Sequence, residues 1–295
     1  MKRVLLDNAY EAWTMAIKYC HLLAEGIATL PVQKQFVSSL HNAVELFLKQ
    51  MMIDAGDHDV ASVRRIKTLD DAQLALRYMT ENDLNKFFSS LSSQELDKFS
   101  SIEFGSLIDK HKSIIKDGLN GQTLKIELKL LQELRNNETH FLITESNFLT
   151  ENDFQTLHNF MIMFYDVIKT AGFMPFWGET FGEDERLIFK GAALTTFSYK
   201  NALQKSSLAL KVADALNGSY EYGDPGCSAY DIAYSLCMSN EKFGYQFDKI
   251  WPIIEMFIRF NMIEYEEIIE EIPEELEHFN RNPNVYYCMS VDIQK

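Results

Sequence analysis

Apolar residues recur at three- or four-residue spacing over long stretches of this chain, and this helical period constrains the fold more than any other feature. No strand pattern is evident before residue 172. We therefore expect the N-terminal half to be an all-α helical bundle. The stretches of this half that carry the helical period are 4–25, 32–55, 123–143 and 150–171.

Polar segments with the spacing of a helix N-cap punctuate this half of the chain. In such a segment a Ser or Thr is answered by an acidic residue three positions later, and each satisfies a backbone N–H of the first turn. The segments are 80–83, 92–95 and 150–153. Each predicts a helix that begins there.

The sequence changes character after residue 172, and we expect three parts. Residues 1–172 form the helical bundle, 173–218 form a linker with a connecting helix at 199–217, and 219–295 form a smaller module. The expected fold class is therefore mainly α, with a helical bundle followed by a smaller α+β domain.

The C-terminal module is expected to contain two helices and then two strands. Ser228 can cap the first helix, and the second begins near Trp251-Pro252, because proline suits a first helical turn. The strands are expected at 262–269 and 285–293. This order resembles that of a winged helix.

The charge of the chain limits its partners. It carries 43 Asp and Glu against 28 Lys and Arg, a formal net charge of −15 at pH 7. Most of the excess lies in 173–295, and eight glutamates fall within 264–277. Strong non-specific binding to nucleic acid needs clustered basic residues that displace counterions, so this composition excludes it. Any RNA contact must be local, or supplied partly by a partner or a second subunit. If the C-terminal module is a winged helix, its acidic wing favours binding to protein over binding to DNA.

Other sequence signals point to a cytoplasmic protein without a metal site. No run of eighteen uncharged apolar residues and no apolar leader occurs, so we expect no membrane span. The cysteines form no CxxC pair and lack His neighbours at zinc-ligand spacing, which favours buried or structural thiols. They are Cys20, Cys227, Cys237 and Cys288.

One polar group near the end of the 123–143 helix has the composition of a catalytic site. Asn136 and His140 lie about 40° apart on an ideal helix, one turn over the other, and Arg135 lies about 100° back from Asn136. The leucines of the same helix point mostly the other way. His140 is therefore expected toward a polar face.

These side chains suit metal-free cleavage of RNA. A histidine can take the proton of the ribose 2′-OH near neutral pH, and an arginine can hold the phosphate as negative charge accumulates. The amide of Asn136 can orient either group. One Arg and one His make a sparse site, so we expect two copies to face each other in a dimer.

The segment 134–141, Leu-Arg-Asn-Asn-Glu-Thr-His-Phe, resembles the R-[N/D/H]-x(3)-H motif of the HEPN superfamily (higher eukaryotes and prokaryotes nucleotide-binding). Upstream, Ala-Val-Glu-Leu-Phe-Leu-Lys at 43–49 is similar to the A-x-E-L-x-L-K pattern on an early helix of many HEPN proteins. The resemblance covers residues 1–172. It implies a four- or five-helix bundle, a homodimer, and metal-independent cleavage that leaves a 2′,3′-cyclic phosphate.

By that resemblance, His140 is the base, Arg135 the phosphate clamp and Asn136 a supporting polar residue, with no cofactor and no metal. Glu45 is the best candidate for a residue that positions these groups from behind. It shares one helix face with His41 and Lys49, where Glu–Lys pairing is also ordinary helix support.

Two functions remain open at this point. The first is an endoribonuclease acting as a toxin or antiviral-defence effector, held in check by an antitoxin or sensor protein that binds the acidic C-terminal region. The second is a non-catalytic HEPN-fold dimer that regulates through nucleotide or protein binding.

Overall fold

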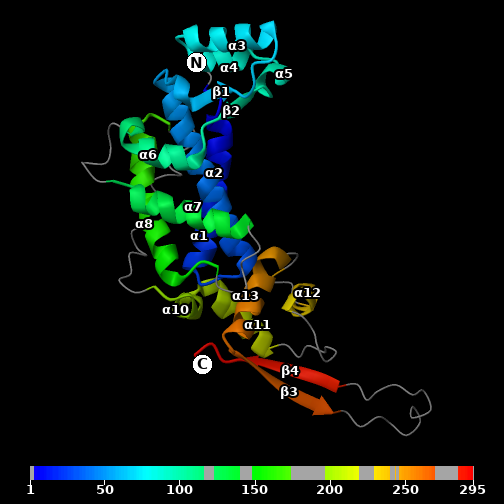
Figure 1. The fold of residues 1–295 in the computed structure, drawn as a ribbon. Helices are drawn as coiled ribbons and strands as arrows, with labels where there is room; N and C mark the ends of the chain where they lie inside the picture. Colours follow the sequence, from blue (N-terminus) through cyan, green and yellow to red (C-terminus); the bar gives the residue numbers. More distant parts are fainter. Residues whose placement is uncertain are drawn as a thin grey trace, which may run out of the picture. The chain divides into compact units, whose positions relative to one another are not determined.

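The computed structural model describes residues 3–115, 123–139, 148–173, 197–218, 229–239, 243, 246–269 and 285–294. The chain divides into two compact units. The first comprises Met1–Cys20 and Gln33–Thr195, and the second comprises His21–Val32 and Thr196–Lys295. In these described ranges helices dominate both units (Figure 1), which confirms the expected mainly α fold class.

The first unit contains most of the long helices. Their bounds are α1 Leu6–Ala24, α2 Leu30–Asp54, α6 Phe104–Ile114, α7 Lys125–Thr139 and α8 Glu151–Thr170; the shorter α3 Leu69–Thr80, α4 Leu84–Ser90 and α5 Ser93–Leu96 lie between α2 and α6. The helices expected from the apolar period correspond to α1, α2, α7 and α8.

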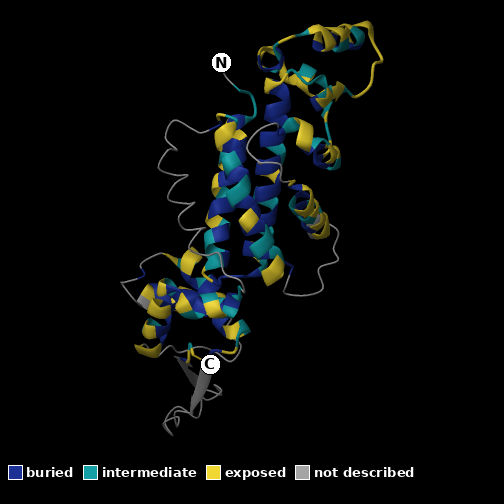
Figure 2. Cartoon of the chain, turned by 90° about the vertical axis from the view of Figure 1, so that its left-hand side faces the viewer, coloured by how far each residue is buried: buried dark blue, intermediate teal, exposed yellow. Residues whose placement is uncertain are grey.

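Aromatic side chains pack α1, α2 and α8 together. The Trp13 ring of α1 lies 6.3 Å from Phe47 of α2 and 6.1 Å from Phe164 of α8, centroid to centroid. Phe36 and Phe154 join α2 to α8 at 5.8 Å. Buried residues recur along the long helices, with intermediate and exposed residues between them (Figure 2). Aromatic burial of this kind contributes a large share of the stability of a helical core.

A small antiparallel ribbon interrupts the helices of the first unit. Strand β1 (Ala61–Val63) pairs with β2 (Phe99–Ser101), with Ala61 opposite Ser101. The expectation that no strand occurs in this half is therefore wrong. Strands of three residues are too short to show an alternating pattern in the sequence, and tertiary pairing alone defines them.

Two of the expected N-caps are confirmed. The Ser92 hydroxyl accepts from the N–H of Glu95, whose carboxylate accepts from the N–H of Ser92, and this capping box opens α5. The same reciprocal pair, Thr150 with Asp153, opens α8. These segments fix the entry of the chain into each helix.

The cap expected at Thr80 is wrong. Thr80 is the last residue of α3, and its hydroxyl donates back to the carbonyl of Leu76 at 2.8 Å. Asp83 caps the next helix instead, because its side chain accepts from the N–H of Lys86. Thr80 and Asp83 thus both lie at helix ends: Thr80 closes α3, and Asp83 caps the start of α4.

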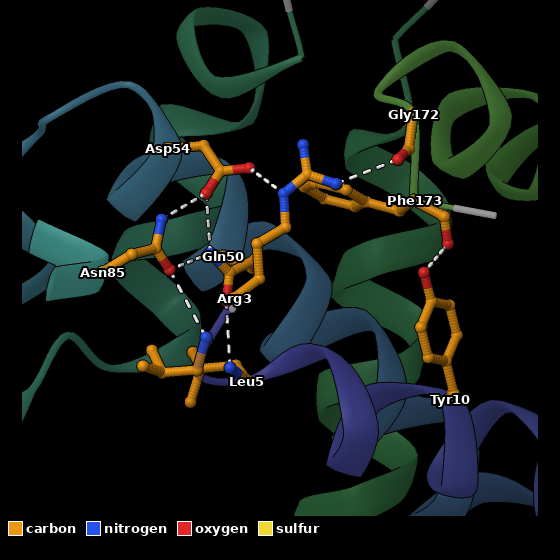
Figure 3. Close-up of polar contacts among 9 residues, drawn as sticks. Arg3, Leu5, Tyr10, Gln50, Asp54, Asn85, Gly172 and Phe173 are labelled. Atoms are coloured by element: carbon orange, nitrogen blue, oxygen red, sulfur yellow. Dashed lines mark hydrogen bonds and ion pairs between the residues drawn. The ribbon is translucent and has the colours of Figure 1, made fainter. Parts of the chain in front are cut away.

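A polar network ties the N-terminal segment to α2, α4 and the end of α8 (Figure 3). Asp54 is its centre: it accepts hydrogen bonds from Gln50 at 2.7 Å and Asn85 at 2.8 Å, and pairs with Arg3 at 2.8 Å. Arg3 also donates to the carbonyl of Gly172 at 2.9 Å. Gln50 and Asn85 are buried, so these bonds satisfy polar groups that would otherwise be costly to bury.

The second unit contains helices α10 (Tyr199–Lys205), α11 (Ser207–Gly218), α12 (Ala229–Ser239) and α13 (Phe247–Arg259), followed by the antiparallel strands β3 (Ile263–Ile269) and β4 (Val285–Val291). The two expected strands are confirmed. Helices α10 and α11, which the sequence assigned to a connecting segment, group with this unit.

Two helix boundaries in this unit differ from the expectation. The single helix expected at 199–217 is two helices, because Ser206 is extended and its hydroxyl accepts from the N–H of Ala209 to start α11. Helix α13 begins at Phe247 and contains Pro252, so the expected start at 251–252 is wrong. Ser228 lies outside the described residues.

Side-chain contacts hold the hairpin and the 21–32 segment to the helices of the second unit. Asn217 at the end of α11 exchanges two hydrogen bonds with the backbone of Val291, at 2.7 and 3.2 Å. Arg259 of α13 donates to the carbonyl of Ala28 at 3.0 Å. None of the helices in the described part of the chain is long and apolar enough to span a lipid bilayer.

Candidate active site

The last turns of α7 carry the first two predicted site residues. The apolar face of α7 is buried within the first unit through Leu128, Leu131 and Leu134. Arg135 and Asn136 are exposed. The amphipathic pattern of α7 therefore places the Arg-Asn pair on its solvent face, as the sequence predicts. His140 lies outside the described residues, so its position one turn beyond Asn136 stays a prediction.

A row of ionisable side chains runs along α2. Glu45 is in the middle: its Oε2 lies 3.6 Å from Nδ1 of His41, and its Oε1 lies 2.5 Å from Nζ of Lys49. His41 is 8% exposed and Lys49 is 7% exposed. We call these three residues the α2 row. Because its two outer members are buried, the row is part of the packed interior rather than a solvated helix face.

The two outer members of the α2 row each have a further contact. The His41 ring packs against Phe104 of α6, with centroids 4.1 Å apart. Lys49 donates to the hydroxyl of Ser101 on β2 at 2.9 Å. These two contacts hold α2 to α6 and to the short ribbon. His41 and Lys49 flank Glu45 on either side along the helix.

Electrostatics link the predicted arginine to this row. Burial lowers the pKa of His41 to about 4; the Glu45 carboxylate opposes this shift, and the positive charges of Arg135 and Lys49 add to it. Arg135 on α7 is therefore within electrostatic range of His41 on α2. At neutral pH the imidazole is uncharged, so the row presents the Glu45 carboxylate and the Lys49 ammonium, and the exposed Arg135 of α7 is a second cation within electrostatic range.

Among the described residues, Arg135 is within electrostatic range of His41, which lies beside the predicted Glu45 in the α2 row. Asn136 is the next residue of the same exposed turn. Reasoning from the sequence assigned His41 and Lys49 to ordinary helix support. Their four-residue spacing around Glu45 was the available signal, but their burial depends on α6 and β2, which the spacing does not reveal.

The exposed cation of this arrangement can bind an anion at the surface. The exposed guanidinium of Arg135 can contact a phosphate in a planar, two-pronged geometry. His41 and Lys49 are too buried to meet a large substrate such as RNA directly. Toward such a substrate they can act only by positioning α2 and setting the local charge. Catalytic proton transfer at the surface must come from another group.

The described cysteine side chains fit the expected structural role, since Cys20 and Cys237 are buried free thiols. In the ranges that the structure describes, no group of three or more His, Cys, Asp or Glu residues could hold a metal ion. No family model, curated protein or solved structure matches the chain.

Proposed function

We propose that this chain is a metal-independent endoribonuclease of the HEPN type, acting as a toxin or antiviral-defence effector. The observation that carries the proposal is the exposed Arg135 at the end of α7, in electrostatic range of the buried α2 row. An exposed cation of this kind can stabilise the negative charge that accumulates on a phosphate in the transition state.

The order of the elements supports the family assignment. The 43–49 segment that resembles the upstream HEPN pattern lies on α2, and the Arg-Asn pair lies in the last turns of the later helix α7. Two segments that are similar to family patterns thus occur on helices, in the expected order. Glu45, from the upstream pattern, lies 3.6 Å from His41 of the same helix, and His41 is within electrostatic range of Arg135.

In the proposed reaction, His140 takes the proton of the ribose 2′-OH. The 2′ oxygen attacks the adjacent phosphorus, and the bond to the 5′ oxygen of the next nucleotide breaks. Arg135 stabilises the charge that accumulates on the phosphate oxygens, and Asn136 orients the phosphate or the imidazole. The products are a 2′,3′-cyclic phosphate and, after the leaving oxygen gains a proton, a 5′-hydroxyl.

We propose that the working site is composite and forms in a homodimer. A chain with a net charge of −15 needs concentrated local positive charge to hold RNA, and two copies of Arg135 supply more than one. The second unit, with helices α12 and α13 followed by the β3–β4 hairpin, is proposed to be winged-helix-like. Its acidic sequence favours docking of a protein, an antitoxin or sensor, over nucleic acid.

The net charge also favours one alternative, a non-catalytic HEPN-fold dimer that binds a nucleotide or protein. The two proposals are separated by incubating the purified protein with a mixed RNA substrate in EDTA. Wild-type protein is compared with Arg135→Ala, His140→Ala and the control Lys129→Ala, which removes another exposed cation of α7. We expect cleavage by wild type and the control only. Cleavage that survives both site substitutions contradicts the site assignment, and no cleavage with nucleotide or partner binding favours the regulator.

A further inference from the structure

The first unit contains a hollow of about 430 Å³ that shares only Lys49 with the α2 row of the proposed nuclease site. It lies between α2, the N-terminal segment, the β1–β2 ribbon and the segment of α4 and α5. Most of its lining is aliphatic or aromatic, including Leu5, Leu46, Phe88 and Phe99. Its size is within the range of natural small-molecule sites, which are mostly apolar with a few placed polar groups.

The polar groups of this hollow are cationic or neutral. Lys49, Arg64 and Ser101 line it, and no carboxylate does. Lys49 and Ser101 are already joined by a 2.9 Å hydrogen bond, which places an ammonium and a hydroxyl side by side. The Lys49 side chain is 8% exposed and its charge is paired with the Glu45 carboxylate, so Lys49 and Ser101 offer the hollow hydrogen-bonding groups.

Arg64 supplies a second, unsatisfied cation at the same hollow. It is exposed, and it forms no ion pair with any residue in the described ranges of the chain. The carboxylate of Glu45 balances the charge of Lys49. The lining therefore keeps about one net positive charge, set at the edge of an apolar interior.

From this combination we propose that the hollow binds an amphipathic organic anion, specifically a medium-chain aliphatic carboxylate. The apolar tail lies between Leu46 and Phe99, and the carboxylate meets Arg64 and the Lys49–Ser101 pair. The scarcity of hydrogen-bonding groups beyond these three disfavours a ligand with many polar atoms, such as a sugar or a nucleobase. This inference does not depend on the proposed nuclease activity.

The proposal is tested by isothermal titration calorimetry with hexanoate and octanoate below micelle-forming concentrations. We expect one site per chain, with affinity rising about two- to fourfold for each added methylene. Octanol and octyltrimethylammonium, which keep the tail but lack the negative charge, are expected to bind at least about fivefold more weakly.

Matched variants locate the site. Arg64→Gln removes a lining cation, and Arg65→Gln removes the adjacent exposed arginine, which does not line the hollow. We expect the dissociation constant for octanoate to rise about fivefold or more in Arg64→Gln and to stay within about twofold in Arg65→Gln. Neither exposed substitution removes a core contact, and circular dichroism verifies folding.

A second pair tests the apolar interior. Leu96→Asp places a carboxylate at the lining, and Leu76→Asp does so at an exposed position on α3 away from it. Only the first is expected to weaken octanoate binding. Absence of saturable binding, equal binding of octanol, or equal effects of Arg64→Gln and Arg65→Gln would overturn the proposal.

Discussion

Replacing His41 by glutamine removes a buried imidazole whose folded-state pKa is lowered to about 4 from a usual value of 6.5. Burial is the main cause, the Glu45 carboxylate opposes it, and Arg135 and Lys49 lower the pKa further. The folded state thus binds fewer protons than the unfolded state between these two values. His41 therefore contributes stability that is present above pH 6.5 and is lost as the pH falls toward 4.

The size of the effect follows from the shift. A pKa unit corresponds to about 1.4 kcal/mol, and at pH 5.0 most of the unfolded state has protonated its histidine while the folded state has not. Wild type should therefore lose about 2 kcal/mol of unfolding free energy between pH 7.5 and 5.0 through His41 alone. Urea unfolding followed by circular dichroism at both values measures this, and His41→Gln should lose about 2 kcal/mol less than wild type does.

The control is His58→Gln, which removes a histidine elsewhere in the first unit and leaves the His41 contribution in place. It is expected to retain the part of the wild-type pH dependence that His41→Gln loses. Equal pH dependence in wild type and His41→Gln would refute the argument that burial keeps this imidazole neutral.

The same imidazole reports on Arg135. If the guanidinium lowers the pKa of His41, its removal in Arg135→Gln must raise that pKa. A titration of the His41 ring by NMR should show the rise in Arg135→Gln and a smaller one or none in Lys129→Gln. An unchanged pKa in Arg135→Gln would remove the link between α7 and the α2 row.

Two further predictions concern stability. Thr150→Ala removes the side-chain cap of α8 and should lower the unfolding free energy in urea by about 1 kcal/mol, whereas Thr156→Ala, inside the helix, should change it by less than about 0.5 kcal/mol. Gly26 has φ +81°, and an added Cβ would lie 2.2 Å from the backbone oxygen of Tyr199. Gly26→Ala should therefore lower the unfolding free energy by more than the roughly 1–2 kcal/mol of left-handed strain. Gly172→Ala, with φ +67° and no atom within 4 Å of the added Cβ, should cost only that strain; equal losses in the two alanine variants would contradict the predicted clash.

The long helices were predictable because local patterns specify them. Apolar residues at helical spacing identified α1, α2, α7 and α8, and the capping pairs at Ser92 and Thr150 marked where α5 and α8 begin. Ser206, by contrast, interrupts an amphipathic pattern without disturbing its period, so the division into α10 and α11 was not visible.

The candidate site was predictable only in part. Arg135 and Asn136 were identified by their motif, and Glu45 by a second motif ninety positions earlier. The electrostatic effect of Arg135 on His41, and the hydrogen bond from Lys49 to Ser101, link segments that are distant in the sequence. No local pattern specifies them.

The central claim is most directly tested by the ends of the RNA fragments that the protein produces in EDTA. We expect wild type and Lys129→Ala to leave 2′,3′-cyclic phosphate and 5′-hydroxyl ends. Arg135→Ala should form these ends about a hundredfold or more slowly, because that is the usual effect of losing one group that stabilises transition-state charge. Equal rates for wild type and Arg135→Ala, or 3′-hydroxyl ends in place of the cyclic phosphate, would contradict it.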